Sequence, residues 1–359
     1  MMIRHINIFV IPICLFVACQ SEKEPESAMT ENKIRVIFDT DANNELDDQH
    51  ALAYLLFNGD VFDVEGITVN STRYGGGIEG HYAEAERILK LCNLNNKIPL
   101  LKGANSDFPS IRRHVGNADY DGSEAVDFIL ERAGEKADKK LILLMVGKLT
   151  NAALAILKRP EIIPDIEILW LGSNYPEPGE YNQDNDTAAM SFLLESDVEL
   201  EIALVRYGQG TGTDAVRATQ QEIRNNMPGK GPESMEPVEG RHGNVFSHFG
   251  DYSVNLFEHI DYHGDPPSRA LFDMAAVAIL KNPQWAKASS IPCPKLIGNK
   301  WVERPDNERK IIIWEHFNRD AIMQDFYAVM ENYTLVGEKM IKVKAEAEAK
   351  AKGSNRTGE

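Results

Sequence analysis

The stretch Ile34-Arg-Val-Ile-Phe-Asp39-Thr-Asp41-Ala-Asn-Asn-Glu45-Leu-Asp47-Asp48 decides how the rest of the chain is interpreted. Its short, β-branched run from Ile34 to Phe38 predicts a buried strand. Five acids follow within ten residues, at the carboxyl end of that strand, where an open α/β sheet binds its ligands. So many neighbouring carboxylates repel one another unless a positive charge lies among them, and a divalent cation with oxygen ligands meets that need. A solvated acidic loop is the alternative interpretation.

Strand-like and helix-like segments alternate after residue 33. This pattern predicts an α/β fold with a mostly parallel, doubly wound open sheet and helices on both faces, in one large domain of residues 33–340. The segment 208–244 is rich in Gly, Pro and charge, which predicts long loops with a short helix near 214–225. The expected strands are 34–38, 64–69, 98–101, 141–146, 166–171, 200–205 and 310–314. The expected helices are 47–58, 78–91, 124–133, 151–157, 187–194, 254–259, 271–280 and 321–332.

Both ends of the chain differ in composition from the domain. Residues 1–18 are weakly basic and then apolar over a run too short to span a bilayer, which predicts a signal peptide. Leu15-Phe-Val-Ala-Cys19 resembles a bacterial lipoprotein box with Cys19 as the lipidated residue, and a plain secreted protein is the alternative. Residues 19–32 predict a flexible tether and 341–359 a charged helical or disordered tail. We therefore expect a lipid-anchored protein of a bacterial cell envelope.

Composition and charge limit the partners. The net charge is −17 and no basic stripe stands out, which argues against nucleic-acid binding. Beyond the apolar start no run is long enough for a membrane span, so we expect membrane contact only through the lipid anchor. Outside the signal peptide and Cys19, only Cys92 and Cys293 remain, too few for a disulfide framework. A small-molecule ligand is the expected partner, and self-association into a homo-oligomer stays open.

Three further polar clusters fall at or near expected strand ends or helix starts. Each has a simpler structural explanation: a strand-to-helix turn with Thr150 as N-cap, an Asx-rich surface loop, and a helix-start carboxylate favoured by the helix dipole. No single cluster therefore defines a site. The clusters are Val146-Gly-Lys-Leu-Thr150-Asn151, then Leu171-Gly-Ser-Asn174 with Glu180-Tyr-Asn182, and finally Arg269-Ala-Leu-Phe272-Asp273.

In this order, the motifs resemble those of the inosine-uridine-preferring nucleoside hydrolases. Asp39-Thr-Asp41 with Asp47-Asp48 is similar to the family's N-terminal acidic signature, and Gly147-Lys-Leu-Thr150-Asn151 to its Gly-Pro-Leu-Thr-Asn turn. Glu180-Tyr-Asn182 resembles its Glu-Phe-Asn, and Asp273 resembles its last metal ligand. The resemblance covers residues 33–282, and the ordered set is specific where single motifs are not.

The resemblance implies a calcium-dependent enzyme that cleaves the N-glycosidic bond of a ribonucleoside to a free base and ribose. The implied Ca²⁺ ligands are Asp41, Asp48, the backbone carbonyl of Thr150, and Asp273, with Asp39 orienting them. Asp41 is the implied general base for a water that attacks an oxocarbenium-like sugar. The residues implied to hold the sugar are Asp47, Asn70, Asn174, Glu180 and Asn182.

Two features of the chain depart from the family pattern. The loop 42–46 is two residues longer than its counterpart, so Asn43, Asn44 or Glu45 could enter the pocket. Phe272 stands where many members have a His, and a phenyl ring cannot protonate a leaving base. The alternative proton donors are His242, His248, His259 and His263, and the alternative stacking partners are Tyr175, Tyr207 and Phe246.

Two other functions are kept open. An apolar strand ending in Asp-x-Asp also opens haloacid-dehalogenase-type, Mg²⁺-dependent phosphotransferases, but these need Thr or Val where this chain has Asn43. Release of phosphate from a phosphomonoester would identify that class. The second alternative function is that of a surface lipoprotein of the same fold, which binds nucleosides or sugars without cleaving them. Calorimetry followed by product analysis separates binding from turnover.

Overall fold

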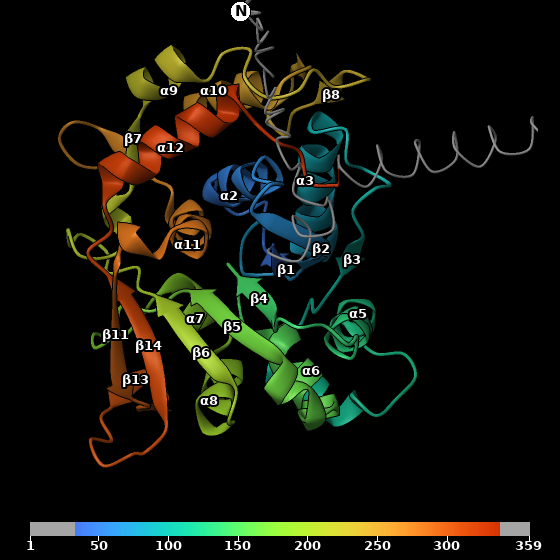
Figure 1. Cartoon of the computed structure of the whole chain (residues 1–359), viewed down its shortest axis with the longest axis vertical. Helices are drawn as coiled ribbons and strands as arrows, with labels where there is room; N and C mark the ends of the chain where they lie inside the picture. Colours follow the sequence, from blue (N-terminus) through green and yellow to red (C-terminus); the bar gives the residue numbers. More distant parts are fainter. Residues whose placement is uncertain (1–32, 338–359) are drawn as a thin grey trace, which may run out of the picture. The chain divides into compact units, whose positions relative to one another are not determined.

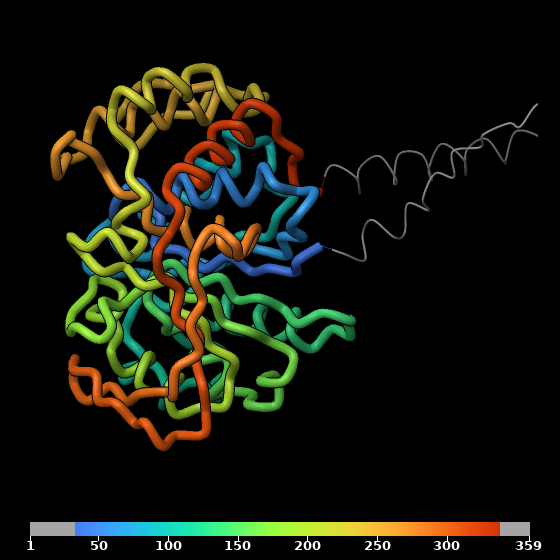
Figure 2. The backbone as a smooth tube through the Cα atoms, turned by 60° about the vertical axis from the view of Figure 1, so that its left-hand side comes forward, coloured from blue at the N-terminus to red at the C-terminus, as the bar shows by residue number. Residues whose placement is uncertain are grey.

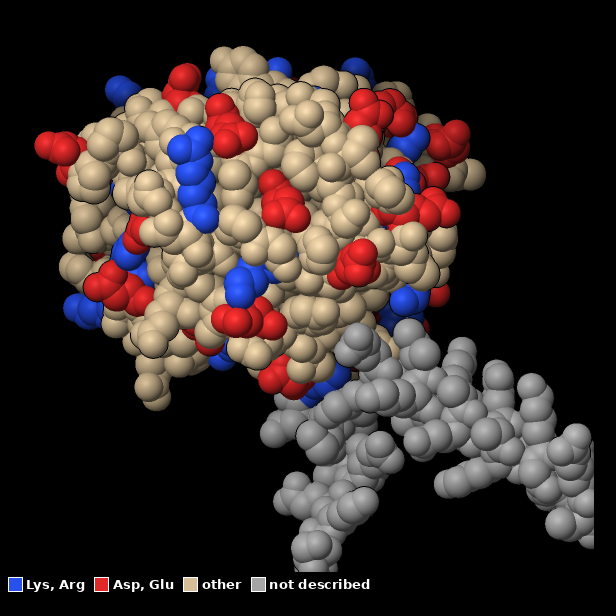
Figure 3. Space-filling view, turned by 90° about the horizontal axis from the view of Figure 1, so that it is seen from above, with Lys and Arg blue, Asp and Glu red and all other residues tan. Residues whose placement is uncertain are grey.

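The structure is a computed structural model that describes residues 33–337. The expected signal peptide 1–18, the tether 19–32 with Cys19, and the tail 341–359 lie outside the described residues. No helix within 33–337 is long and apolar enough to cross a membrane. On the face seen in Figure 3, acidic and basic side chains are scattered without forming a basic stripe.

The expected sheet is confirmed. It has eight strands in the order β11-β14-β6-β5-β4-β1-β2-β3, and all neighbours pair in parallel except β11 with β14 (Figure 1). The parallel strands are near-continuous apolar runs because helices bury both of their faces. The strands of this sheet are β1 Ile34–Thr40, β2 Phe62–Val69, β3 Leu100–Lys102, β4 Leu141–Met145, β5 Ile166–Leu171, β6 Glu199–Ala203, β11 Lys287–Pro292 and β14 Lys310–Glu315.

The strand order reverses between β1 and β4. Consecutive strands run outward from β1 through β2 to β3, and from β4 through β5 to β6 on the other side. Helices after β1 and β4 therefore diverge to opposite faces and leave a crevice beyond the strand ends, where doubly wound sheets bind ligands. The register sets Asp39 of β1 beside Thr68 of β2 and Met145 of β4. The acidic stretch and the turn after β4 consequently meet at this crevice.

Helices cover both faces of the sheet, and α9, α10 and α12 lie outside α2 and α11 on one of them (Figures 1 and 2). One apolar core lies under α2, α3, α10, α11 and α12, and a second lies under α4, α5, α6 and α8. The α-helices are α2 Asp47–Leu56, α3 Gly77–Leu91, α4 Phe108–Ile111, α5 Ser123–Ala133, α6 Thr150–Lys158, α7 Tyr181–Asn185, α8 Thr187–Glu195, α9 Gln220–Asn226, α10 Phe249–Glu258, α11 Phe272–Lys281 and α12 Arg319–Glu331. The 3₁₀ helices are η1 Arg112–His114, η2 Pro160–Asp165, η3 Thr213–Ala215 and η4 Pro283–Trp285.

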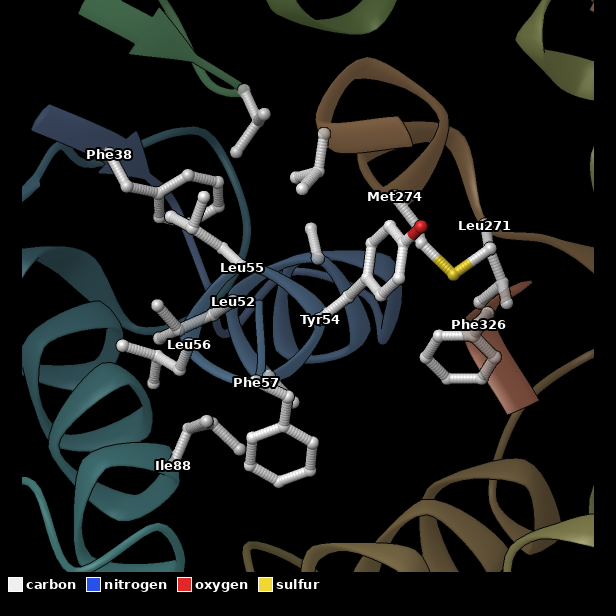
Figure 4. Close-up of a cluster of buried hydrophobic side chains, with 14 of the residues drawn as sticks. Phe38, Leu52, Tyr54, Leu55, Leu56, Phe57, Ile88, Leu271, Met274 and Phe326 are labelled. Atoms are coloured by element: carbon white, nitrogen blue, oxygen red, sulfur yellow. The ribbon is translucent and has the colours of Figure 1, made fainter. Parts of the chain in front are cut away.

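Helix α2 is buried along its whole length. Its residues Leu52, Leu55 and Leu56 pack against Phe38 and Ile88, as Figure 4 shows. Burial of each leucine stabilises the fold by about 1.5–3 kcal/mol. Helix α12, distant in sequence, lies beside α2 in both ribbon views. The helix that carries two of the acids is thus held from several sides, which fixes where its first turn points.

The structure differs from expectation in the segments that pair over long distances. The expected helix near 214–225 is only partly correct: η3 and the strand β7 Arg217–Thr219 precede α9. Strand β7 pairs antiparallel with β10 Ser268–Ala270. A three-residue strand is too short to show a sequence pattern, and the strand that pairs with it lies far along the chain. The other short strands pair as hairpins, β8 Val238–Glu239 with β9 Val245–Phe246 and β12 Lys295–Ile297 with β13 Lys300–Val302.

Candidate active site

A pocket of about 660 Å³ opens at the carboxyl ends of the central strands. Its lining comes from the acidic stretch after β1, the loops after β4, β5 and β6, and the β10–α11 turn. A cavity of this size accepts a small organic ligand. Six of the residues expected to form a site line it: Asp41, Asp47, Asp48, Glu180, Asn182 and Asp273.

Three carboxylates converge at one side of the pocket. Asp47 and Asp48 lie in the first turn of α2 and Asp273 lies in the first turn of α11. Each can offer one oxygen so that all three oxygens lie within 4.8 Å of one another. All three residues are buried, and the two helix N-termini contribute partial positive charge that favours carboxylates there.

Burial and mutual repulsion raise the pKa values of this cluster. Burial raises the pKa of Asp48 to about 8, with the neighbouring Asp47 charge adding to it, and burial raises that of Asp47 to about 7. Burial and the surrounding carboxylates hold the pKa of Asp273 and of Asp41 well above the usual range. A divalent cation would remove the repulsion and keep all four groups ionised at neutral pH. The residues present therefore fit an oxygen-ligated metal ion.

Asp41 has one free carboxylate oxygen. Its Oδ2 accepts hydrogen bonds from Asn44 Nδ2 at 2.6 Å and from the hydroxyl of Thr72. Its Oδ1 is buried and has no hydrogen-bond partner among the described residues. Buried polar atoms are rarely left without a partner, so this oxygen is available to a metal ion, a water or a substrate hydroxyl.

Gly147 lies in the turn after β4, and its lack of a side chain leaves room for the side chains of Asp41 and Asn70. A Cβ at this position would lie 2.5 Å from Asn70 Nδ2 and 2.8 Å from Asp41 Oδ1. Only glycine permits the backbone to approach the two side chains so closely. The sequence marked Gly147 only as part of a motif, because the need for glycine there depends on Asp41 and Asn70, which directly follow two other strands.

Asp39 lies behind the pocket rather than on its surface. Its carboxylate accepts hydrogen bonds from Thr68 Oγ1 at 2.5 Å, from Asn70 Nδ2 at 2.7 Å and from Asn151 Nδ2 at 2.7 Å. Burial raises its pKa to about 6, and these three donors limit the rise. Asn151 also accepts from the Ala104 backbone N–H at 2.8 Å. Asp39 thus joins β1, β2 and α6, which is the position of a group that orients its neighbours.

Glu180 and Asn182 face the pocket from the loop after β5. Glu180 caps α7, and its carboxylate accepts from the backbone N–H groups of Ser173, Asn182 and Gln183. Burial raises its pKa. Asn182 Nδ2 donates to the carbonyls of Val146 and Leu171, which leaves its buried Oδ1 without a partner among the described residues. That oxygen can accept a hydrogen bond from a ligand hydroxyl.

Besides Asp39, three of the expected residues are not among those that line the pocket. Asn70 is buried beside Asp39, with its own Oδ1 unpaired among the described residues. Asn174 donates to the Gly179 carbonyl and accepts from the Tyr207 backbone N–H at 3.2 Å. Thr150 begins α6, and its hydroxyl donates to Asp186 at 2.5 Å. The roles expected for these three stay predictions.

Each polar residue of the longer loop 42–46 contacts a different part of the chain. The Asn43 backbone N–H donates to His81 Nδ1 at 3.2 Å, and Asn43 Nδ2 donates to the Gly75 carbonyl at 2.8 Å. Asn44 contacts Asp41, and Glu45 forms an ion pair with Arg269. Asn44 and Glu45 line the pocket and Asn43 does not. The longer loop therefore brings two polar side chains to the pocket wall.

Aromatic and basic residues form the rest of the wall. The rings of Tyr207 and Phe272 meet edge to face, with centroids 5.7 Å apart. Among the candidate histidines only His263 lines the pocket, whereas His242 stacks on His259. Sequence reasoning did not assign roles to the pocket residues Asp214, Arg217 and Arg269. Of these three residues, only Arg269 had a sequence signal, which was its position in the cluster that ends at Asp273.

The fold and the site define a class: a doubly wound α/β protein with a carboxylate-lined pocket for a small molecule. The chain belongs to the inosine-uridine preferring nucleoside hydrolase family, whose sequence model matches residues 36–350. It is accordingly an N-glycosyl hydrolase by family. The family is metal-dependent, and the cluster of Asp47, Asp48 and Asp273 agrees with that requirement.

Several solved structures share this fold. A plant nucleoside hydrolase matches with a TM-score of 0.62 at 16% identity, over 83% of this chain and 98% of its own. The inosine-uridine preferring nucleoside hydrolase from Bacillus anthracis matches with a TM-score of 0.59 at 17% identity, over 83% and 99%. A purine-preferring ribonucleoside hydrolase from Gardnerella vaginalis matches with a TM-score of 0.57 at 18% identity, over 82% and 98%. A search of curated proteins found no match.

Proposed function

We propose that this protein hydrolyses the N-glycosidic bond of a ribonucleoside to a free base and ribose, with Ca²⁺ as cofactor and Asp41 as general base. The observation that carries the proposal is the buried Oδ1 of Asp41, which has no partner within residues 33–337 and lies beside the carboxylates of Asp48 and Asp273. Calcium prefers about six to eight oxygen ligands, which suits a site built from carboxylates.

Asp48 and Asp273 would hold the ion, with Asp41, Asp47 and the Thr150 carbonyl as further candidate ligands. Bound Ca²⁺ would supply positive charge that orders a water and the ribose hydroxyls. Asp41 Oδ1 would take a proton from that water while the water oxygen bonds to the anomeric carbon. General base catalysis of this kind is worth about 10²–10⁴-fold.

The remaining polar groups would bind and orient the sugar. Asn182 Oδ1 and Glu180 accept hydrogen bonds, and buried carboxylates such as Asp47 stabilise the positive charge that develops on the ribose ring. Asn70 and Asn174 are proposed to support the same site. Positioning by several such groups lowers the barrier further because the reacting atoms are held in place.

A nucleoside panel tests the proposal. We expect the wild-type protein to release base and ribose, and a calcium chelator to abolish release. We expect Asp41→Asn to remain folded and to lose turnover by about 10²–10⁴-fold, whereas the matched control Asp63→Asn, at an exposed position of β2, keeps full activity. Full turnover by Asp41→Asn would disprove the assigned base.

The same panel separates the alternatives. Binding of nucleosides without product would support a non-catalytic binding protein, although the family does not favour it. Phosphate release from a phosphomonoester would support a phosphotransferase, which the family match also disfavours.

We also propose that the protein is anchored to a bacterial cell envelope through Cys19. The support is the apolar start and the Leu15-Phe-Val-Ala-Cys19 sequence. Fractionation of cells that express the full chain tests it: the wild type should partition with membranes and Cys19→Ser should not. Equal partitioning of both would contradict the anchor.

A further inference from the structure

Part of the pocket wall is not explained by sugar or metal binding. The acids and amides described above account for the side at the strand ends. Glu45, Arg217, Arg269, Phe272 and Tyr207 line the rest. If the sugar occupies the carboxylate side, this remaining wall is the part left for the leaving group. Its two guanidinium groups are the cationic donors that it offers, beside neutral donors such as Tyr207 and Gln209.

The first guanidinium, that of Arg217, is saturated by protein partners. Its Nη1 donates to Asp214 at 2.6 Å, its Nε to Ser268 Oγ at 2.9 Å, and its Nη2 to the carbonyls of Ser268 and His263. All three nitrogens therefore have acceptors. Arg217 holds the loop after β6 against the segment before β10, and it has little capacity left for a ligand.

The second guanidinium, that of Arg269, is unsaturated. The Nη2 group forms an ion pair with Glu45, while its buried Nε has no hydrogen-bond partner among the described residues. The side chain is only 11% exposed. A buried N–H donor without an acceptor costs about 1–3 kcal/mol. The guanidinium that carries this donor lies in the pocket wall, where a ligand acceptor would meet its positive charge.

The backbone fixes Arg269 relative to the acidic cluster. Arg269 pairs with Ala218 in the β10–β7 ladder, and β10 leads directly into α11 with Phe272 and Asp273. Glu45 holds the guanidinium from the other side, at the end of the longer loop that contacts Asp41. The donor is thus pre-positioned from two elements that also carry the acids.

We propose that Arg269 is the residue that stabilises the departing base, and that Glu45 positions it. The inference rests on the proposed nucleoside hydrolysis. As the bond between the anomeric carbon and the base nitrogen breaks, the electron pair goes to the base, which leaves as an anion. Water supplies a hydroxyl to the anomeric carbon and a proton to Asp41. The base takes up a proton from solvent after it leaves.

Arg269 stabilises this step by charge and hydrogen bonding and does not transfer a proton, because a guanidinium stays protonated in proteins. Arg269 thereby assists the departure of the base, which Phe272 cannot do because a phenyl ring donates no proton. Removal of a donor aimed at developing negative charge typically costs about 10²–10³-fold in rate. The cost is largest for leaving groups that form unstable anions.

Substrates with different leaving groups test the proposal. One set is inosine, guanosine, adenosine, uridine and cytidine, and the other is 4-nitrophenyl β-ribofuranoside, whose nitrophenolate is a stable anion. We expect Arg269→Gln to lower kcat/KM for the nucleosides by about 10²–10³-fold and for the nitrophenyl riboside by less than about tenfold. Arg269→Lys should recover part of the loss, since it keeps the charge and loses the planar fork. Glu45→Gln should show the same substrate dependence with a smaller loss.

The controls separate the possible failures. Arg224→Gln breaks an exposed ion pair with Glu258 and should change neither substrate class. Equal losses of Arg269→Gln on both classes, or unchanged nucleoside turnover, would overturn the role of Arg269 while leaving the proposed function intact. Absence of wild-type turnover on both classes would overturn the proposed function itself and the inference with it.

Discussion

Asn151 donates a hydrogen bond to Asp39 over 2.7 Å and so ties the first turn of α6 to the end of β1. The two residues are 112 positions apart in the chain. Their contact crosses the switch point of the sheet, and the pocket lies directly beyond it. The relationship links the stability of the fold to the geometry of the site.

Substitution Asn151→Ala should destabilise the protein. It removes one donor to the buried Asp39 carboxylate and the acceptor of the Ala104 N–H, and an unsatisfied buried group costs about 1–3 kcal/mol, more when it is charged. Urea unfolding measures the change in the free energy of unfolding. The control Asn117→Ala, at an exposed position, should be neutral, and equal midpoints for the two variants would contradict the prediction.

Substitution Gly147→Ala should reduce activity more than stability. The added methyl group would press against Asn70 and Asp41 Oδ1, and a displacement of about 1 Å in a catalytic group can cost about 10²-fold in rate. Steady-state kinetics and thermal unfolding, measured together, check this. Gly116→Ala meets no atom within 4 Å and serves as the control. A fully active Gly147→Ala enzyme would show that the contact does not matter.

Substitution Asp273→Asn should separate metal binding from stability. Removing one charge from the repelling cluster should leave the metal-free protein at least as stable as the wild type. Added Ca²⁺ should stabilise only the wild type, by about 2.7 kcal/mol at a free concentration of 100 times Kd. Thermal unfolding with and without a chelator measures both effects. A calcium-induced shift that persists in Asp273→Asn would exclude this residue as a ligand.

Substitution Glu167→Gln should change the pH dependence of stability without touching the pocket. Burial and the neighbouring Glu201 charge raise the pKa of Glu167 from 4.5 to about 7. The folded state therefore binds the proton more tightly than the unfolded state, and the favourable contribution present below pH 4.5 is lost as the pH rises through about 7.

The variant should consequently gain stability relative to the wild type between about pH 4.5 and pH 8. Urea midpoints across this range provide the measurement, and Asp165→Asn, at an exposed position directly before β5, is the matched control. A difference between variant and wild type that does not vary with pH would contradict the assignment.

The regular part of the fold could be predicted from local patterns. The strands at 34–38, 64–69 and 166–171 were placed within two residues of their observed bounds, because buried parallel strands are continuous apolar runs. The pairing of β7 with β10 and the antiparallel edge strand β11 could not be predicted. Their partners lie far along the chain and their patterns are short.

The sequence could predict those residues of the candidate site that lie where the ends of strands and helices meet. Asp41, Asp48 and Asp273 follow or open regular elements whose ends converge in a doubly wound sheet. Asn70 and Asn174 show what this reasoning leaves open, since their side chains bond to neighbours and are not among the residues that line the pocket. A motif places a residue near a site, while its hydrogen bonds decide which way it points.

The sequence by itself determined the doubly wound fold, the acidic stretch at the end of its first strand, and the family to which these point, because each is encoded in patterns a few residues long. The tertiary structure alone decided that Asp41 keeps a free oxygen, that Gly147 must be glycine, and that Glu45 meets Arg269. These relationships join segments up to hundreds of residues apart. They depend on backbone positions that the packed sheet and helices set together.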